Sequence, residues 1–579
     1  MTDGYLTDWP ISERFPHYTR ANAGEVMGAP VTPLSWTWGW EGAMVLGMRD
    51  GWIRGGTHEM ADFDSDYPET FGMFGGYFYL NLSSVRIQGV RHPGATVEQL
   101  DMAFFGDHPD VPTYIPHPED DKPHLVERIE ANTAWVMGAE TWPELDQDKA
   151  DAQALRESRG YLTQRSDAEL VERARSIRPM LHHLFEQHTV SGSSAAIAPG
   201  ILGVVAEAIG DTEIPMKLLA GMGDVDSTLP NHALWDMSRK IRASEVLTAA
   251  LDAGLDGVLE RLAADRSAEA ADLLADWEAF IIEFGSRGPN EWDIHADSWE
   301  TNPALPLAAL DRVRLQSDDE SPHLRHDAVA AQREQLTAEV REKVADNEEL
   351  SGMVEAALIA GNMMAYRERT KTTIVKVLHE GRMVFLELGR RHAEAGNLVD
   401  ADHIFMLLEP ELDAFIAAPA SFRDTLAQRA ADFAALADLE PPFIIEDGNL
   451  PPLSSWGRRS EAAVAAKAAA GSEIVGVSGS PGVARGTARI VLDAGDPAAL
   501  EPGDILVAPF TDPSWTPLFM TAGAVVVDVG GQISHAVIVS RELGLPCVVS
   551  ATDATSVIPD GATIEVDGST GTVTVLELA

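Results

Sequence analysis

A proline-rich break near residue 440 divides the chain into two parts with different periodicity. Pro441, Pro442, Pro451 and Pro452 punctuate it, and proline interrupts both helices and β-ladders. From about 122 to 440, apolar residues recur at intervals of three and four, which predicts helices. After residue 473, short runs rich in Val and Ile alternate with Gly, Pro or Asp, which predicts strands. The expected fold class is therefore α+β and multidomain, with a mostly α-helical domain followed by a compact β/β/α domain.

The expected boundaries follow from this change of pattern. Residues 1–440 form the helical domain, and residues 1–120 are a mixed part of it, rich in Trp and Gly. Residues 441–472 are a linker whose alanine-rich stretch, 458–470, predicts a short helix. Residues 473–579 form the β-rich domain. The four early tryptophans are expected in a core more readily than around an apolar substrate pocket, and they are Trp36, Trp38, Trp40 and Trp52.

The charge balance excludes two classes of partner. Asp and Glu number 91 against 43 Lys and Arg, which gives a net charge of −48. Binding to nucleic acid or to an anionic membrane surface needs clustered cations, so neither is expected.

The chain shows no signal-peptide pattern and no run of 18 apolar residues, which favours a cytoplasmic protein. A single cysteine, Cys547, excludes a disulfide framework and a cysteine metal cluster.

The strongest chemical candidate is His535. A buried strand is expected over 524–529, followed by Gly530 and Gly531. Ser534 is a plausible N-cap for a helix of about nine residues that ends at Gly544. His535 then lies in the first turn, where unpaired N–H groups and the helix dipole favour an anion. An imidazole in that place can accept a phosphoryl group as a nucleophile.

The segment 530–546 resembles the phosphorylated-histidine motif of the swivelling domain of phosphoenolpyruvate (PEP)-utilising enzymes, such as PEP synthase and pyruvate phosphate dikinase. Residues 478–486 and 502–507 resemble the opening and the middle strand of that domain. One position departs from the dikinases, which usually carry Thr where this chain has Ile533. The resemblance implies that His535 carries a phosphohistidine on a mobile domain that swings about the linker.

Most of the remaining chain resembles rifampicin phosphotransferase. The loop 511–519, which contains Trp515, resembles the corresponding loop there, and the region around Arg20 resembles the start of its substrate domain. Residues 285–294 resemble a Gly-His-Arg-Gly segment, with Ser286 in place of the His. The resemblance implies supporting roles for Arg287, Glu291 and Asp293 on this loop, and a buried ion pair is an equally good interpretation of it.

A cation-rich segment lies at 366–392. If it is one helix, Arg367, Lys371 and Arg382 fall within roughly 60° of one another, so one face would present three cations to a phosphoryl group. A charge run is usually a solvated face with salt bridges. Residues 367–371 resemble an Arg-Glu-x-x-Lys segment of the same family, which implies catalytic roles for Arg367 and Lys371 and a supporting role for Glu368.

These resemblances imply a dikinase-type phosphotransferase subunit. The match begins near residue 15 and lacks the ATP-grasp domain of the family, so ATP and Mg²⁺ are expected on a separate, PEP synthase-like ATP-grasp subunit, as in phenylphosphate synthase. The expected acceptor is a hydroxyl or enol of a small hydrophobic organic compound. The alternatives are a PEP- or pyruvate-linked phosphocarrier and a non-catalytic scaffold with a vestigial His domain.

No metal site is expected within the chain. The segment from Asp62 to Asp66 begins like a calcium loop but lacks its glycine and its bidentate Glu. His182, His183 and His188 have no spacing that indicates zinc.

Overall fold

The chain forms two compact units in a computed structural model. The described residues are 4–105, 111–211, 214–219, 226, 228–461, 466–492, 500–511, 515–531 and 534–578. The first unit comprises Met1–Ile197, Trp292–Ala296 and Asn362–Ala463, and the second comprises Ala198–Glu291, Asp297–Gly361 and Val464–Ala579. The protein is an α+β multidomain chain, as the sequence predicts.

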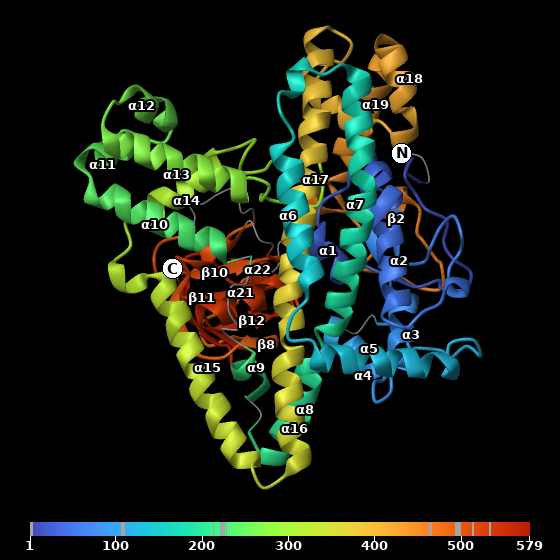
Figure 1. The fold of residues 1–579 in the computed structure, drawn as a ribbon, viewed down its shortest axis with the longest axis vertical. Coiled ribbons are helices and arrows are strands. Elements are labelled where there is room, and N and C mark those ends of the chain that lie inside the picture. The colour runs from blue at the N-terminus through green and yellow to red at the C-terminus, as the bar shows by residue number, and fades with distance from the viewer. Residues whose placement is uncertain are drawn as a thin grey trace. The chain divides into compact units, whose positions relative to one another are not determined.

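The first unit is built on two long helices that lie side by side, α7 (Asp167–Ser194) and α17 (Asn362–Glu394) (Figure 1). α7 begins with a capping box, in which the Ser166 hydroxyl accepts from the Glu169 N–H while the Glu169 carboxylate accepts from the Ser166 N–H. α2 (Val45–Arg54) and α6 (Pro143–Glu157) pack against these helices, α2 on α7 and α6 on α17.

A small antiparallel sheet completes this framework. Its strand order is β2 (Phe71–Phe74), β3 (Tyr77–Asn81), β1 (Tyr18–Thr19) and β5 (Ile444–Ile445). β2 and β3 form a hairpin around Gly75 and Gly76, and both glycines have a positive φ that a residue with a side chain rarely adopts. The other helices of this unit are α1 (Ala23–Val26), α3 (Leu82–Arg91), α4 (Val97–Phe105), α5 (Val126–Gly138), α18 (Leu412–Ala417) and α19 (Arg423–Leu436).

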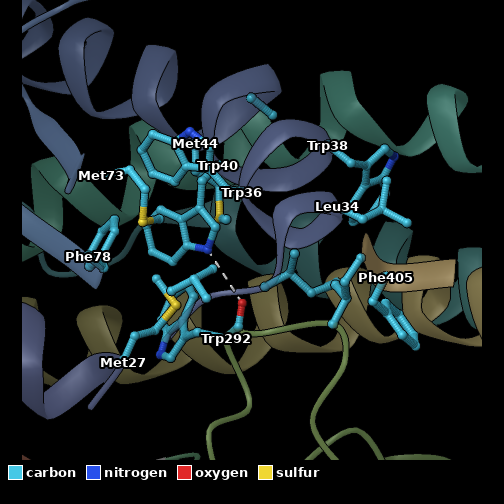
Figure 2. Packing of buried hydrophobic residues seen from close by; sticks show 14 of the residues in the cluster. Met27, Leu34, Trp36, Trp38, Trp40, Met44, Met73, Phe78, Trp292 and Phe405 are labelled. Atoms are coloured by element: carbon cyan, nitrogen blue, oxygen red, sulfur yellow. Dashed lines mark hydrogen bonds between the residues drawn. The ribbon is translucent and has the colours of Figure 1, made fainter. Parts of the chain in front are cut away.

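The early tryptophans lie in the core of the first unit. Trp36, Trp38 and Trp40 occupy a π-helical stretch, Ser35–Met44, and each is at most 2% exposed. Figure 2 shows them packed with Met44, Phe78, Trp292 and Phe405. The indole N–H groups are satisfied in part by distant carbonyls, since Trp38 donates to Ala174 O at 3.0 Å. This confirms the core interpretation of the tryptophan cluster.

The second unit combines a helical part with the C-terminal β-rich domain. The helical part carries its own apolar core, which includes Trp277, Phe280 and Trp299. Its helices are α8 (Ile197–Ile209), α9 (Ile214–Leu218), α10 (Leu229–Ala243), α11 (Glu245–Asp252), α12 (Val258–Ala264), α13 (Ala268–Phe284), α14 (Ala304–Val313), α15 (Pro322–Val344) and α16 (Glu348–Ala360).

The β-rich domain contains an eight-stranded mixed sheet in the order β7-β14-β13-β9-β10-β11-β12-β8. β9, β10, β11 and β12 run parallel to one another, and the remaining neighbours pair antiparallel. Apolar clusters cover both faces of the sheet, which explains why β10 and β11 are continuous apolar runs. The strands are β7 (Glu473–Val475), β8 (Val477–Ser480), β9 (Val483–Ile490), β10 (Ile505–Ala508), β11 (Ala524–Val527), β12 (Cys547–Val549), β13 (Thr563–Asp567) and β14 (Thr572–Glu577).

The expected linker helix over 458–470 is not found in the described part of that stretch. Instead β6 (Gly457–Arg458) pairs with β4 (Leu439–Glu440), and a 3₁₀ turn follows at Arg459–Glu461. Ser460 hydrogen-bonds Asp438 through both its N–H and its hydroxyl. An alanine-rich segment this short is a marginal helix on its own, so these local pairings prevail at its start.

Candidate functional site

His535 is the first residue of α21 (His535–Leu543), as the sequence predicts. Ser534 occupies the N-cap position with extended backbone angles, and the helix ends at Gly544, whose φ of 65° is left-handed. The Ser534 hydroxyl makes no capping hydrogen bond, so Ser534 caps the helix by position and not through its side chain. All nine residues of α21 are buried, and Arg541 donates to Gly479 O at 3.0 Å, which anchors the helix to β8.

Gly530, which precedes α21, is closely surrounded by other residues. A Cβ on Gly530 would lie 3.1 Å from the Ser534 hydroxyl and 3.4 Å from both Val527 and Val549. A side chain at the position that follows β11 would therefore be in tight contact with the N-cap residue of α21 and with two strand valines. Ile533, the position that departs from the dikinases, lies outside the described residues.

Two threonine hydroxyls contact the ring of His535. Nδ1 lies 3.1 Å from Thr511 Oγ1, and Nε2 lies 3.3 Å from Thr516 Oγ1. The ring meets Phe519 edge to face at 5.7 Å, and the residue is 7% exposed. A hydroxyl can donate or accept, so each threonine fits either tautomer of the ring. The imidazole is thus held by groups that tolerate a change in its protonation or substitution.

Trp515 lies next to the residues that contact His535. It is 3% exposed and precedes α20 (Thr516–Phe519), the short helix that supplies both Thr516 and Phe519. Trp515 is therefore a buried neighbour of the residue whose hydroxyl contacts Nε2. Residues 512–514 of the same predicted loop lie outside the described residues.

In the first unit, Arg367 and Lys371 lie one turn apart on α17, which confirms that the cation-rich segment is helical. Arg367 donates to Glu368 at 3.3 Å, and Glu368 is 2% exposed. His188 of α7 joins them: its Nδ1 lies 3.0 Å from Thr370 Oγ1, and both cations lower the pKa of its ring. Four charged or titratable side chains of two helices, Arg367, Glu368, Lys371 and His188, therefore lie in this region.

The other cations of the segment serve the protein itself. Arg369 pairs with Asp146 at 2.7 Å, Arg390 with Glu387 at 2.9 Å and Arg391 with Asp167 at 2.8 Å. These are the surface salt bridges that a charge run usually forms. The cations of this segment therefore differ in their surroundings, and only some of them lie next to His188.

Arg382 belongs to the core of the first unit. It is 1% exposed, and it contacts His379 Nδ1 at 3.0 Å and donates to Asp293 O at 3.1 Å. The Asp293 carboxylate accepts from both the N–H and the hydroxyl of Thr32, at 3.0 and 2.9 Å. These two predicted site residues therefore hold chain segments together in this structure.

Arg20 is likewise bound within the protein. Its guanidinium donates to the carbonyls of Phe78, Met27 and Gly28 and lies 5.0 Å from the centre of the Tyr77 ring. Burial lowers the pKa of Arg20. The guanidinium braces the strand-and-loop framework of the first unit.

Arg287 and Glu291 form a buried ion pair in the second unit, with Nε 3.1 Å from Oε2 and exposures of 2% and 1%. This is the ion pair that the sequence offers as the alternative to a substrate role. Sequence reasoning missed His188 and Thr370 altogether. Their signal is tertiary, because they come from helices 182 positions apart, and no spacing within one helix reveals it.

One small pocket lies in the first unit, lined among others by Trp52, Gln88, His92, Asn132 and Ser194. Among the described residues, no group of three or more His, Cys, Asp or Glu side chains is placed to hold a metal ion.

The stretch Asp167–Ile209 is long and apolar enough to cross a membrane, the single such stretch in the part of the chain described. A core helix passes the same test, and α7 packs along α2 and α17.

Two family models match the chain. Residues 185–368 match the rifampicin phosphotransferase fourth domain, and residues 500–571 match the mobile domain of PEP-utilising enzymes. The second match contains His535, and the first includes His188 and Arg367.

Relatives support the same assignment. An uncharacterised protein of Mycobacterium tuberculosis is 35% identical over 59% of this chain and 36% of its own length. The rifampicin phosphotransferase of Streptomyces sviceus is 31% identical over 62% of this chain and 40% of its own length. A prodigiosin-synthesising transferase of Serratia marcescens is 32% identical over 52% of this chain and 33% of its own length. The matches thus span well under two thirds of each relative. Residues 185–368 therefore resemble a domain of rifampicin phosphotransferase, residues 500–571 resemble the mobile domain of PEP-utilising enzymes, and the chain as a whole is similar to these enzymes.

Proposed function

We propose that this protein is a phosphotransferase component in which His535 accepts a phosphoryl group from ATP and relays it to a hydroxyl of a small, hydrophobic organic compound. The observation that carries the proposal is the setting of His535. It opens a buried helix after a strand and a glycine turn, and both of its ring nitrogens contact threonine hydroxyls. The helix N-terminus stabilises the added negative charge.

The phosphoryl donor in this proposal is ATP bound with Mg²⁺ on a separate ATP-grasp subunit. In this proposal that subunit holds both the metal and the nucleotide, and this chain contributes His535. In the dikinase-type reaction, the β-phosphoryl goes to His535, the γ-phosphoryl goes to water, and AMP is released. The reaction would run in the cytoplasm, where ATP is available.

The acceptor end of the relay is assigned to Arg367 and Lys371. Two cations on one helix face neutralise charge on a phosphoryl group during transfer. Aromatic rings surround the neighbouring His188, with Phe185 at 5.5 Å and Trp292 at 6.2 Å. Aromatic surroundings favour an apolar substrate body. By their names, one relative acts on rifampicin and another synthesises prodigiosin, and both are organic compounds.

Labelling tests the donor step. The full chain is incubated with the ATP-grasp subunit, Mg²⁺ and ATP labelled in the β-phosphate, and label on the protein is measured after alkaline and acid treatment, because a phosphohistidine survives base and not acid. We expect acid-labile label in the wild type and none in His535→Ala.

Matched controls decide the alternatives. His392→Ala removes a histidine of the first unit that pairs with Asp167 and should keep the label. Label from PEP in place of ATP would support the phosphocarrier alternative. Label that persists in His535→Ala, or no label from either donor, refutes the proposal.

A further inference from the structure

His188 occupies a position that the sequence assigns to no function. It lies on α7, in the last third of a helix that packs along α17, and it reaches the turn that carries Arg367 and Lys371. Its Nδ1 is 3.0 Å from Thr370 Oγ1, and Ser191 Oγ lies 3.4 Å from the same oxygen. A titratable ring is thus fixed beside the two cations of the proposed acceptor site.

The hydrogen bonds around Thr370 define the tautomer of His188. The Thr370 hydroxyl donates its proton to Arg367 O at 2.9 Å. With that proton engaged, the Thr370 oxygen can accept from His188, which favours the tautomer that carries the ring proton on Nδ1. A neutral imidazole has one N–H and one lone pair, which leaves the lone pair on Nε2.

The surroundings keep the ring neutral. Burial first, and then Arg367 and Lys371, lower the pKa of His188 to about 3. His183, one and a half turns earlier on the same helix, shows the opposite effect, because its hydrogen bond to Asp148 raises its pKa. The ring plane of His188 is also held, since Phe185 meets it edge to face and Trp292 lies tilted across it.

We propose that His188 presents the lone pair of Nε2 to the hydroxyl proton of the phosphoryl acceptor and so orients the attacking oxygen. This inference rests on the proposed function and narrows its substrate class. A lone pair is attracted to a hydroxyl hydrogen and repels a carboxylate or an enolate oxygen. The acceptor is therefore a protonated alcohol or phenol, and anionic oxygens are rejected.

The transfer step balances without a further reactant. The acceptor oxygen attacks phosphorus, an O–P bond forms, and the P–N bond to His535 breaks with its electron pair staying on that imidazole. The hydroxyl proton replaces the phosphoryl group on His535. His188 is neutral before and after, because its role is a hydrogen bond to the hydroxyl while Arg367 and Lys371 face the phosphoryl charge.

Nitrogen NMR of the full chain with ¹⁵N-labelled histidine tests the tautomer and the ligand class together. His188→Gln assigns the signal by its disappearance. At pH 7 we expect a neutral ring protonated at Nδ1, and phenol as the probe should shift the Nε2 signal in a saturable way. Benzoate, which matches phenol in its ring but carries no proton on oxygen at this pH, should leave the signal unchanged. A ring protonated at Nε2, a cationic ring, no shift with phenol, or an equal shift with benzoate overturns the proposal.

A single-turnover assay supplies the functional arm. His535 is phosphorylated chemically with potassium phosphoramidate, excess reagent is removed, and phenyl phosphate is measured after phenol is added. We expect His188→Asn to slow transfer at least tenfold, and His188→Gln, whose amide oxygen reaches the position of Nε2, to retain more activity. His183→Gln on the same helix is the matched control. Equal rates for wild type and His188→Asn overturn the proposal.

The two arms separate this inference from the function on which it rests. Absence of phenyl phosphate from the wild type refutes the proposed acceptor, and the NMR comparison then decides the role of His188 alone. Absence of a phosphohistidine at His535 refutes the donor step and leaves the NMR result intact.

Discussion

The sites around His535 and His188 are formed in opposite ways. His535 owes its setting to consecutive residues, because strand β11, the glycine turn and α21 follow one another within 20 positions. His188 owes its setting to α7 and α17, which are distant in sequence and meet only in the folded first unit. A site built from consecutive residues survives damage elsewhere in the fold, whereas an assembled site depends on every contact that holds its helices together.

The largest effect is expected where α17 is held to α6 and α7. Glu380 is fully buried and pairs with Arg159 at 2.6 Å and Arg173 at 3.2 Å. Removing one partner from a buried network leaves uncompensated charge, so Glu380→Ala should lower the free energy of unfolding of the first unit by about 3–5 kcal/mol. Urea unfolding followed by tryptophan fluorescence measures it.

Glu394→Ala is the control for this prediction, since it removes an exposed pair with Arg390 on the same helix and should change stability by less than about 0.5 kcal/mol. If Glu380→Ala were as stable as this control, the assembled site would not depend on that network.

Arg367→Ala should separate the two sites functionally. Loss of one group that stabilises transferring charge typically costs a factor of about 10²–10³. We expect transfer from phosphorylated His535 to an acceptor to slow by about that factor, while the amount of phosphohistidine formed stays unchanged. Arg390→Ala, which loses a surface cation of α17, is the matched variant and should transfer normally. Equal losses in both variants would contradict the assignment.

Gly530→Ala probes the site built from consecutive residues. The new methyl group would meet Ser534 at 3.1 Å and two valines at 3.4 Å, so the variant should lose about 1 kcal/mol of stability in the second unit. Gly352→Ala lies in α16 with open space around it and should gain roughly 0.5–1 kcal/mol instead. Thermal unfolding of both variants gives the comparison, and a neutral Gly530→Ala would show that the turn tolerates a side chain.

The last comparison concerns how pH changes the stability contributed by two histidines of α7, His183 and His188. The raised pKa of His183 means that its pair with Asp148 adds stability fully below the ordinary pKa of 6.5, and this is lost as pH rises through the higher folded value. The pair is half exposed, so its contribution is below about 1 kcal/mol. His188 acts in the opposite sense: its folded pKa of about 3 makes stability fall as pH drops from 6.5 toward that value.

Urea unfolding midpoints of the wild type, His183→Gln and His188→Gln are measured between pH 5 and 8, and they give the dependence of stability on pH for each protein. Replacing His183 should remove a loss of stability above pH 6.5, and replacing His188 should remove a loss below it. If both substitutions changed the pH dependence of stability in the same direction relative to the wild type, this account would be contradicted.

Much of the His535 region follows from the sequence alone. Strand β11, the glycine turn, the N-cap at Ser534 and the end of α21 at Gly544 all lie where the pattern predicts them. Each depends on interactions between residues fewer than about six positions apart, which glycine and capping residues report directly.

The residue pattern was enough to predict that α17 is a helix bearing cations on one face. Which of these cations lie at a candidate site depends on partners from other helices, and therefore on the folded first unit. Arg382 is drawn into the core by Asp293 O, Arg391 pairs with Asp167, and Arg367 and Lys371 lie near His188. A side chain's charge is written in the sequence, but its pKa, its burial and its hydrogen-bond partners arise from segments that meet only when the chain folds.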